Sequence, residues 1–237
     1  MTVLRSIVFQ IYFAVMSVVM NIGWVPALLG PRRWAVKGIE VWAALTLWGL
    51  RVICGLTYEV RGREHLAGSP VIYAGKHQSM WDTVVLPLIV RDPALVLKRQ
   101  LLFIPFYGWY ALKTRMIALD RGAHAKALRS LIFQARDRLN AGRSIAIFPE
   151  GTRKKIGAAP DYKPGVSALY TQLNVACVPF ALNSGLYWAG WRRRPGRIVI
   201  EFLPPIQAGL KRPVFMAELQ GRIEAATARL VAGGGGA

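Results

Sequence analysis

The chain has 237 residues and a formal charge of +19, from 31 basic and 12 acidic side chains. This length suits one domain with a single core, with or without an appendage. The positive charge predicts an anionic partner, which can be a nucleic acid, a phospholipid or a phosphorylated substrate. With 54% hydrophobic residues and a mean hydropathy of +0.32, the chain differs from most nucleic-acid-binding modules and is more typical of a protein that contacts a membrane.

Residues 1–57 are predicted to form a hydrophobic helical membrane anchor. No charged residue occurs between Arg5 and Arg32. As one helix, this uncharged segment is long enough to cross a hydrocarbon core of about 30 Å. A second apolar segment, residues 36–56, carries charges and is unlike a span. A single span, a two-helix hairpin in one leaflet and a cleaved signal peptide are all open, and the hairpin is favoured. Because Arg32, Arg33 and Lys37 should stay cytoplasmic, we expect the inner membrane, with the rest of the chain on the cytoplasmic side.

From residue 58 onward, short apolar strands alternate with helical stretches. This alternation predicts an α/β domain over residues 58–232, with a mixed, largely parallel central sheet flanked by helices. Residues 233–237 read as a flexible glycine-rich tail. The predicted strands are residues 71–74, 95–98, 116–119, 145–148, 175–181 and 198–202, and the predicted helices include residues 128–139 and 217–231.

The stretch GKHQSMWDT, residues 75–83, places His77 and Asp82 just after the first of these strands. An imidazole can take a proton from an alcohol when its other nitrogen donates to a carboxylate that orients the ring. A turn from loop to helix lets residues five apart face each other. The alternative is a surface histidine with Asp82 on a solvated helix face, and the spacing alone does not separate the two.

The segment FPEGTR, residues 148–153, follows another strand and should emerge at the same sheet edge as His77. Arg153 offers a planar fork that matches phosphate oxygens, and Thr152 adds a hydroxyl donor. This composition predicts a phosphate site. The alternative is a charged surface loop in which Glu150 pairs with Arg153. Further positive charge nearby comes from Lys154, Lys155 and Lys163.

His77 and Asp82, followed by FPEGTR, resemble the glycerolipid acyltransferase family, and within it the bacterial 1-acyl-glycerol-3-phosphate acyltransferases. The likeness extends over most of residues 58–205, because two weaker family blocks occur in the same order. Met116 stands where one of these blocks often opens with a small residue, which puts the role of Arg121 in question. The weaker blocks are residues 104–109 with 116–121, ending in Arg121, and residues 178–180.

The resemblance implies a glycerol-3-phosphate acyltransferase-like fold and transfer of an acyl chain to the sn-2 hydroxyl of 1-acyl-glycerol-3-phosphate, giving phosphatidic acid. His77 would be the general base and Asp82 would orient it, without an acyl-enzyme, since no G-x-S-x-G motif is present. Acyl-CoA or acyl carrier protein would be the donor substrate, with no bound cofactor and no metal. The expected acceptor-phosphate residues are Glu150, Gly151, Thr152, Arg153, Arg121 and Lys163, and the candidates for an acyl pocket are Val178 and Pro179.

Other acceptors within the same family stay open: a lyso-ornithine lipid, another lysophospholipid or glycerol 3-phosphate. Two other classes are disfavoured. A nucleic-acid-binding protein would not need the uncharged N-terminal segment, and an inactive membrane scaffold would have no reason to retain both motifs. No nucleic-acid partner is expected.

The remaining features are predicted to be supporting ones. The cluster of aromatic and basic residues at 188–194 is a candidate contact with anionic membrane lipids, or else a solvated loop, with Arg192 to Arg194 as the leading cations. Cys54 and Cys177 are expected to be reduced core thiols, and His65 and His124 to be structural.

Overall fold

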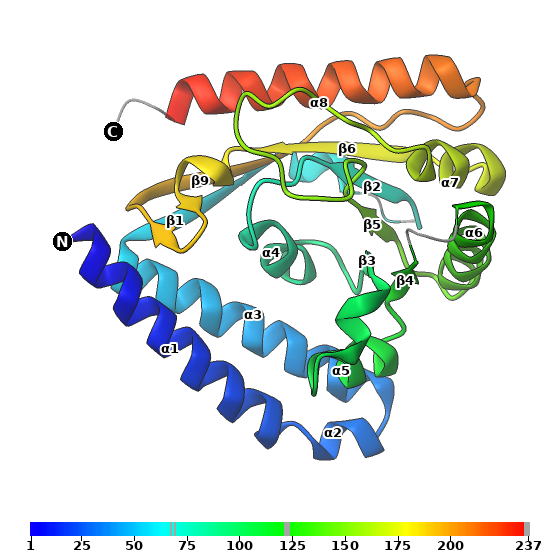
Figure 1. The fold of residues 1–237 in the computed structure, drawn as a ribbon. Coiled ribbons are helices and arrows are strands. Elements are labelled where there is room, and N and C mark those ends of the chain that lie inside the picture. Colours follow the sequence, from blue (N-terminus) through cyan, green and yellow to red (C-terminus); the bar gives the residue numbers. More distant parts are fainter. Residues whose placement is uncertain (67, 69, 121–123, 235–237) are drawn as a thin grey trace.

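The computed structural model describes residues 1–66, 68, 70–120 and 124–234 (Figure 1). At its centre is a sheet with the strand order β1-β9-β6-β2-β5-β3-β4, and β7 and β8 form a separate small hairpin. The strands are β1 (Leu56–Arg61), β2 (Ile72–Gly75), β3 (Ala94–Lys98), β4 (Ile117–Leu119), β5 (Ile145–Ile147), β6 (Cys177–Leu182), β7 (Trp188–Ala189), β8 (Arg192–Arg193) and β9 (Gly196–Phe202).

The helices cover both faces of this sheet. They are α1 (Thr2–Gly23), α2 (Pro26–Leu29), α3 (Arg32–Cys54), α4 (Trp81–Ile89), α5 (Tyr107–Lys113), α6 (His124–Asn140), α7 (Gly165–Leu173) and α8 (Arg212–Gly234). The 3₁₀ turns are η1 (Arg63–His65), η2 (Arg99–Phe103) and η4 (Ser184–Leu186).

The sheet is largely parallel, which confirms the predicted fold class. Strand β2 pairs in parallel with both β5 and β6, and β3 pairs in parallel with β4 and β5. Only at one side does the direction change, because β9 runs antiparallel to β6, and β1 follows β9 in parallel. The central strand β2 is buried throughout, as expected for a parallel strand covered on both faces.

Alternate residues of β2 point into two separate apolar layers. Tyr73 packs with residues of α3 and α4 on one face, whereas Ile72 and Ala74 pack with residues of α6, α7 and α8 on the other. Figure 1 shows α8 along one side of the sheet and α1 and α3 beyond the other side. The carboxyl ends of β2, β5 and β6 therefore meet at one edge of a rigid sheet.

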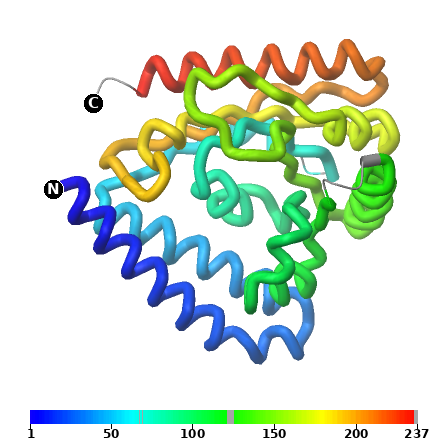
Figure 2. Tube along the Cα trace, viewed as in Figure 1, coloured from blue at the N-terminus to red at the C-terminus, as the bar shows by residue number. Residues whose placement is uncertain are grey.

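The N-terminal residues form two long helices that lie side by side in opposite directions, joined through α2 (Figures 1 and 2). The Tyr12 hydroxyl donates to the Leu45 carbonyl at 2.9 Å, and Trp42 Nε1 donates to Ser17 Oγ at 3.0 Å. Phe9 of α1 is fully buried and meets the Trp188 ring edge-on, with the ring centroids 5.9 Å apart. This N-terminal hairpin, residues 1–54, is thus packed against the rest of the chain.

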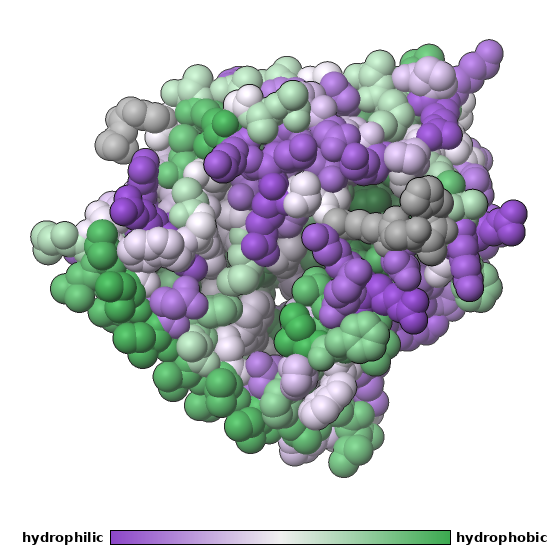
Figure 3. Space-filling model, in the orientation of Figure 1, coloured by the Kyte–Doolittle hydropathy of each residue, from purple (hydrophilic) through white to green (hydrophobic). Residues whose placement is uncertain are grey.

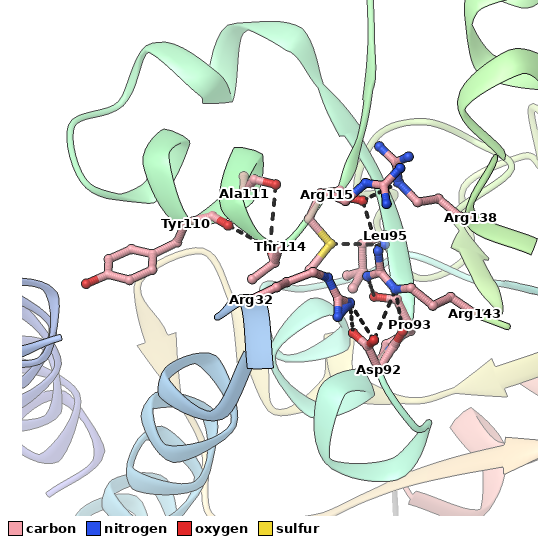
Figure 4. Close-up of polar contacts among 11 residues, drawn as sticks. Arg32, Asp92, Pro93, Leu95, Tyr110, Ala111, Thr114, Arg115, Arg138 and Arg143 are labelled. Atoms are coloured by element: carbon pink, nitrogen blue, oxygen red, sulfur yellow. Dashed lines mark hydrogen bonds and ion pairs between the residues drawn. The ribbon is translucent and has the colours of Figure 1, made fainter. Parts of the chain in front are cut away.

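A polar cluster joins the start of α3 to the end of α4 (Figure 4). Arg32 donates to Asp92 Oδ1 at 2.6 Å and also bonds Oδ2. Arg143 Nε lies 3.2 Å from Asp92 Oδ2, and its guanidinium also donates to the Asp92 carbonyl. Burial lowers the pKa of Arg143 to about 10, because the charged form loses hydration. Asp92 holds both cations and so fixes the hairpin to the sheet domain.

Helix α1 is the one helix in the described ranges that is long and apolar enough to cross a membrane, and little of its apolar stretch is buried. Its outward side carries exposed apolar residues, which Figure 3 shows as a hydrophobic band along α1. These residues are Ile7, Val8, Ile11, Val15, Val18, Val19 and Ile22.

Both predicted domain boundaries need small corrections. Strand β1 begins at Leu56, inside the segment predicted as the anchor, because Leu56 is buried in the core beneath α3. Helix α8 continues to Gly234, where the Gly234 carbonyl accepts a hydrogen bond from the Tyr187 hydroxyl at 3.0 Å. The predicted tail therefore starts too early, and residues 235–237 lie outside the described residues.

Candidate active site

His77 and Asp82 face each other just beyond the carboxyl end of β2. The chain leaves β2 at Gly75 and turns into α4, and Asp82 lies in the first turn of this helix. His77 Nδ1 lies 2.9 Å from Asp82 Oδ2. The same oxygen accepts the backbone N–H groups of Gln78 at 2.6 Å and Ser79 at 2.8 Å. A carboxylate at a helix N-terminus suits this role, because it satisfies backbone donors that lack a helical partner.

This arrangement selects one tautomer of the imidazole. Asp82 is fully buried, and its carboxylate acts as the acceptor in every contact it makes within the described chain. His77 Nδ1 must therefore carry a proton and donate it to Asp82, which leaves Nε2 free to accept a proton. The His77 side chain is 12% exposed, so a substrate group can still reach it.

The FPEGTR segment and the lysine that follows it contact the ring and the backbone of His77. Phe148, just after β5, stacks on the imidazole with ring centroids 4.2 Å apart. The Lys154 N–H donates to the His77 carbonyl at 2.8 Å. Since β2 and β5 are parallel neighbours, the two motifs leave the sheet side by side. The structure thus brings together the two segments that the sequence analysis placed at one edge.

Within FPEGTR, the side chains divide between the interior and the surface. Gly151 has φ +66°, a conformation that favours glycine, and its N–H donates to the Phe148 carbonyl at 2.9 Å. Thr152 and Arg153 after this turn are exposed. Arg153 makes no hydrogen bond or ion pair with any residue that the structure describes. Its guanidinium is available to an anion.

The Glu150 side chain points into the interior, so its predicted role as an acceptor-phosphate residue needs correction. Its side chain is buried in an ion pair with Lys76, and Lys76 Nζ also contacts Glu224 of α8 at 2.7 Å. A buried, negative carboxylate is not placed to touch an acceptor phosphate. The alternative in which Glu150 pairs with Arg153 is also not what the structure shows.

The other predicted site residues are scattered. Lys163 is exposed and pairs with Asp161 at 2.7 Å, while its backbone N–H donates to the Pro149 carbonyl at 2.9 Å. Val178 and Pro179 are buried in β6, where an acyl-pocket role stays a prediction. Arg121 lies outside the described residues. No group of three or more His, Cys, Asp or Glu side chains in the described ranges is placed to hold a metal.

The prediction that residues 192–194 present a basic cluster at the surface is wrong for Arg193. Arg192 and Arg194 are exposed, but Arg193 is buried, with its guanidinium 4.3 Å from the centre of the Trp188 ring. Burial lowers the pKa of Arg193. This side chain belongs to the contact between α1 and the β7-β8 hairpin, and it is not presented to a membrane surface.

The cysteines agree with their predicted role, and His65 lies outside the site. Cys54 and Cys177 are free and buried, and burial raises the pKa of the Cys177 thiol, which makes it a poor nucleophile. His65 lies in η1, 3.7 Å from Glu64. The side chain of His124 lies outside what the structure describes.

Sequence reasoning missed residues that hold this site. Lys76 directly precedes His77, and a lysine at the end of a buried strand could have signalled a buried ion pair. Ser184 follows β6 at the edge where β2 and β5 also end, so the rule for carboxyl ends of strands could have indicated it. Glu224 comes from α8, and no local pattern connects it to Lys76.

Known acyltransferases are similar to this chain in sequence. The family model described as Acyltransferase matches residues 57–183. A 1-acyl-sn-glycerol-3-phosphate acyltransferase of Pseudomonas aeruginosa is 38% identical over 189 residues, which cover 79% of this chain and 74% of that protein. The protein of the same name in Escherichia coli is 26% identical over 206 residues, covering 86% and 82%.

A solved structure shares the whole fold. The crystal structure of the 1-acyl-sn-glycerophosphate (LPA) acyltransferase PlsC from Thermotoga maritima aligns with a TM-score of 0.78, over 97% of this chain and 98% of that one. The sequence identity is 21%, so this match supports the fold, including the N-terminal helices, and says nothing further of the site.

Proposed function

This chain belongs to the acyltransferase family, and from this premise we propose that it transfers an acyl chain from a thioester donor to the sn-2 hydroxyl of 1-acyl-glycerol-3-phosphate, giving phosphatidic acid. The donor would be acyl-CoA or acyl carrier protein, used as a substrate, with no bound cofactor. The observation that carries the proposal is the pairing of His77 with the buried Asp82, together with an exposed Arg153 in the neighbouring segment that has no partner among the described residues.

The chemistry follows from the tautomer of His77. Nε2 removes the proton of the acceptor hydroxyl, and the oxygen attacks the thioester carbonyl carbon. Asp82 accepts the Nδ1–H throughout and stabilises the imidazolium that forms. When the tetrahedral intermediate collapses, the C–S bond breaks, and the imidazolium returns the proton to the leaving thiolate. An ester and a thiol result, without an acyl-enzyme.

Backbone donors for the oxyanion are expected near the motifs. The N–H groups of Gln78 and Ser79 are already bonded to Asp82, and that of Gly151 to the Phe148 carbonyl. The oxyanion donors should therefore come from other groups around His77.

The acceptor phosphate would lie at Arg153 and Thr152. Their loop is joined to the His77 carbonyl through Lys154, so an anion bound there lies close to the base. Lys163 would add positive charge at the edge of this loop, and Arg121 keeps the expected role in phosphate binding that the family resemblance gives it. The buried Glu150 would hold the loop in place from behind.

The N-terminal hairpin would attach the enzyme to the inner membrane from the cytoplasmic side. The exposed apolar side of α1 supports insertion into one leaflet. A full crossing by α1 would pull Phe9 away from Trp188 and Ser6 away from Arg193, whose N–H donates to Ser6 Oγ at 2.9 Å. These contacts favour the hairpin over a span. Anionic lipids would interact with exposed cations around the hairpin.

The proposed function can be tested with purified protein, labelled acyl-CoA and acyl carrier protein, and a panel of acceptors. The panel contains 1-acyl-glycerol-3-phosphate, a lyso-ornithine lipid, a second lysophospholipid and glycerol 3-phosphate. We expect the highest kcat/KM with the first acceptor and phosphatidic acid as product. Preference for another acceptor would reject the proposed substrate, and absence of transfer to all four would reject the proposed reaction.

A further inference from the structure

The turn Asn183–Ser184–Gly185 leaves the carboxyl end of β6 and packs against the His77 loop. Ser184 is fully buried, and its hydroxyl donates to Asp82 Oδ1 at 2.5 Å. The two residues are 102 positions apart in the sequence. Asp82 thus has His77 on one oxygen and Ser184 on the other.

Ser79 completes this buried arrangement. Its hydroxyl is 2.9 Å from Ser184 Oγ and 3.1 Å from Asp82 Oδ1, and it accepts the Trp81 N–H at 3.2 Å. Each serine has one hydroxyl proton to donate. Ser184 therefore donates its hydrogen bond to Asp82, and the Ser79 hydroxyl donates a hydrogen bond divided between Ser184 and Asp82. Every polar atom in the group then has a partner.

The neighbours of Ser184 hold it in place. The Gly185 N–H donates to Gln78 Oε1 at 2.9 Å, and a Cβ on Gly185 would lie 3.1 Å from Ile156. Asn183 Oδ1 accepts the Val199 N–H at 2.8 Å, and Nδ2 donates to the Leu230 carbonyl at 3.2 Å. The turn is therefore fixed to β9 and α8 on one side and to the His77 loop on the other.

We propose that Ser184 is a positioning residue, which orients His77 by fixing the carboxylate plane of Asp82. The three N–H donors on Oδ2 do not by themselves fix Oδ1, which is held by the two serine hydroxyls, with the shorter contact from Ser184 at 2.5 Å and the longer from Ser79 at 3.1 Å. This inference rests on the proposed role of His77 as general base. When the Asp82 carboxylate rotates, the oxygen that accepts the hydrogen bond from Nδ1–H moves with it. The imidazole ring then turns, and the Nε2 lone pair no longer points toward the hydroxyl of the substrate.

The test compares Ser184→Ala, Ser184→Cys and Ser184→Thr in the full-length protein. Alanine removes the hydroxyl, and cysteine fills the space but donates weakly. For both variants we expect kcat to fall about 10- to 100-fold, with KM for donor and acceptor unchanged. Threonine keeps the hydroxyl and should restore most of kcat. Wild-type kcat in Ser184→Cys would overturn the proposal, because the residue would then act by packing alone.

Two further measurements make the outcome decisive. Ser167→Ala is the matched control, because Ser167 is equally buried but donates to the Pro164 carbonyl away from Asp82, and it should leave kcat unchanged. In an Asp82→Asn background, Ser184→Ala should have no further effect, whereas an additional, multiplicative loss would overturn the proposal. Absence of acyl transfer in the wild type would instead reject the proposed function.

A readout independent of activity is the NMR signal of the His77 Nδ1 proton, assigned by its loss in His77→Ala among the three histidines of the chain. Ser184→Ala should shift or broaden this signal, and Ser167→Ala should not. An unchanged signal in Ser184→Ala would contradict the proposal even if no acyl acceptor were known.

Discussion

Lys76 Nζ lies 3.0 Å from Glu150 Oε1, and the two side chains are only 4% and 1% exposed. Lys76 directly precedes His77, and Glu150 directly precedes Gly151, so this ion pair joins the segment of the proposed base to the segment of the proposed phosphate residues. Glu224 adds a third partner at 2.7 Å and connects α8 to the pair. The Tyr162 hydroxyl donates to Glu224 at 3.0 Å, and burial, with the charge of Glu224 second, raises the pKa of Tyr162.

The first prediction concerns Lys76→Met. Glu150 would be left as a buried charge without its cation, and Glu150 Oε2 already has no hydrogen-bond partner in the described chain. Removing one member of a buried pair costs about 3–5 kcal/mol, so the free energy of unfolding should fall by that amount, as measured by denaturant unfolding in detergent. Lys37→Met is the control, because its pair with Glu40 is exposed, and it should cost about 1 kcal/mol or less. A loss of that small size in Lys76→Met would mean that the buried pair does not hold the two segments together.

The second prediction concerns His77→Ala. Loss of a positioned general base should lower kcat/KM by about 10²- to 10⁴-fold, while circular dichroism and the unfolding temperature change little. His65→Ala is the matched control, since His65 lies in η1 beside Glu64 and outside the site. Near-normal turnover in His77→Ala would exclude the proposed mechanism.

The third prediction concerns Arg153→Ala. Because Arg153 is exposed and has no partner in the described chain, its loss should act on substrate binding and leave the fold unchanged. We expect KM for a phosphorylated acceptor to rise about 10- to 100-fold, with KM for the acyl donor unchanged. Arg153→Lys keeps the charge without the planar fork, so its KM for the phosphorylated acceptor should lie between the values of the wild type and of Arg153→Ala. Equal increases in both KM values would move Arg153 out of the phosphate site.

The outline of the fold and the two motifs could be predicted from local patterns. The run Ile72–Ala74 is apolar throughout, and the His77–Asp82 spacing fits the turn into α4. Strand β1 was missed because Glu59 and Arg61, which pair with each other at 2.6 Å, break its apolar pattern at the edge of the sheet. Edge strands keep a solvated side, so hydropathy gives a weak signal there.

The interior of the site could not be predicted in this way, because its contacts join distant segments. Glu150 was predicted to bind the acceptor phosphate because of its place in FPEGTR. In the structure its carboxylate instead pairs in the interior with Lys76, which lies 74 positions earlier in the sequence. Arg193 was assigned to the surface by its basic neighbours, yet Phe9 and Trp188 bury it. In both cases the composition of the segment was right about charge, and the direction of the side chain was decided by partners far along the chain.

The last prediction concerns membrane attachment, and it requires point variants of the whole chain. Removing residues 1–57 would take Leu50, Cys54 and Leu56 out of the core, so a shortened protein would test folding as well as attachment. Ile11 and Val18 lie on the outward side of α1, 60% and 58% exposed. Ile11→Glu with Val18→Glu places two charges where the proposed hairpin enters the leaflet, at a large cost in transfer free energy. We expect this double variant to leave anionic vesicles in a flotation assay, while the wild type stays bound.

High salt separates the two contributions to attachment. Salt screens the attraction between exposed cations and anionic lipids, which is about 1 kcal/mol for each cation near the surface, but leaves apolar burial in place. The wild type should therefore stay on the vesicles in high salt. Phe133→Glu with Val214→Glu is the matched control, because it charges two exposed apolar residues on α6 and α8, away from the hairpin, and it should not alter flotation. If salt alone releases the wild type, or if the control leaves the vesicles as readily as the α1 variant, α1 is not embedded and the attachment is electrostatic.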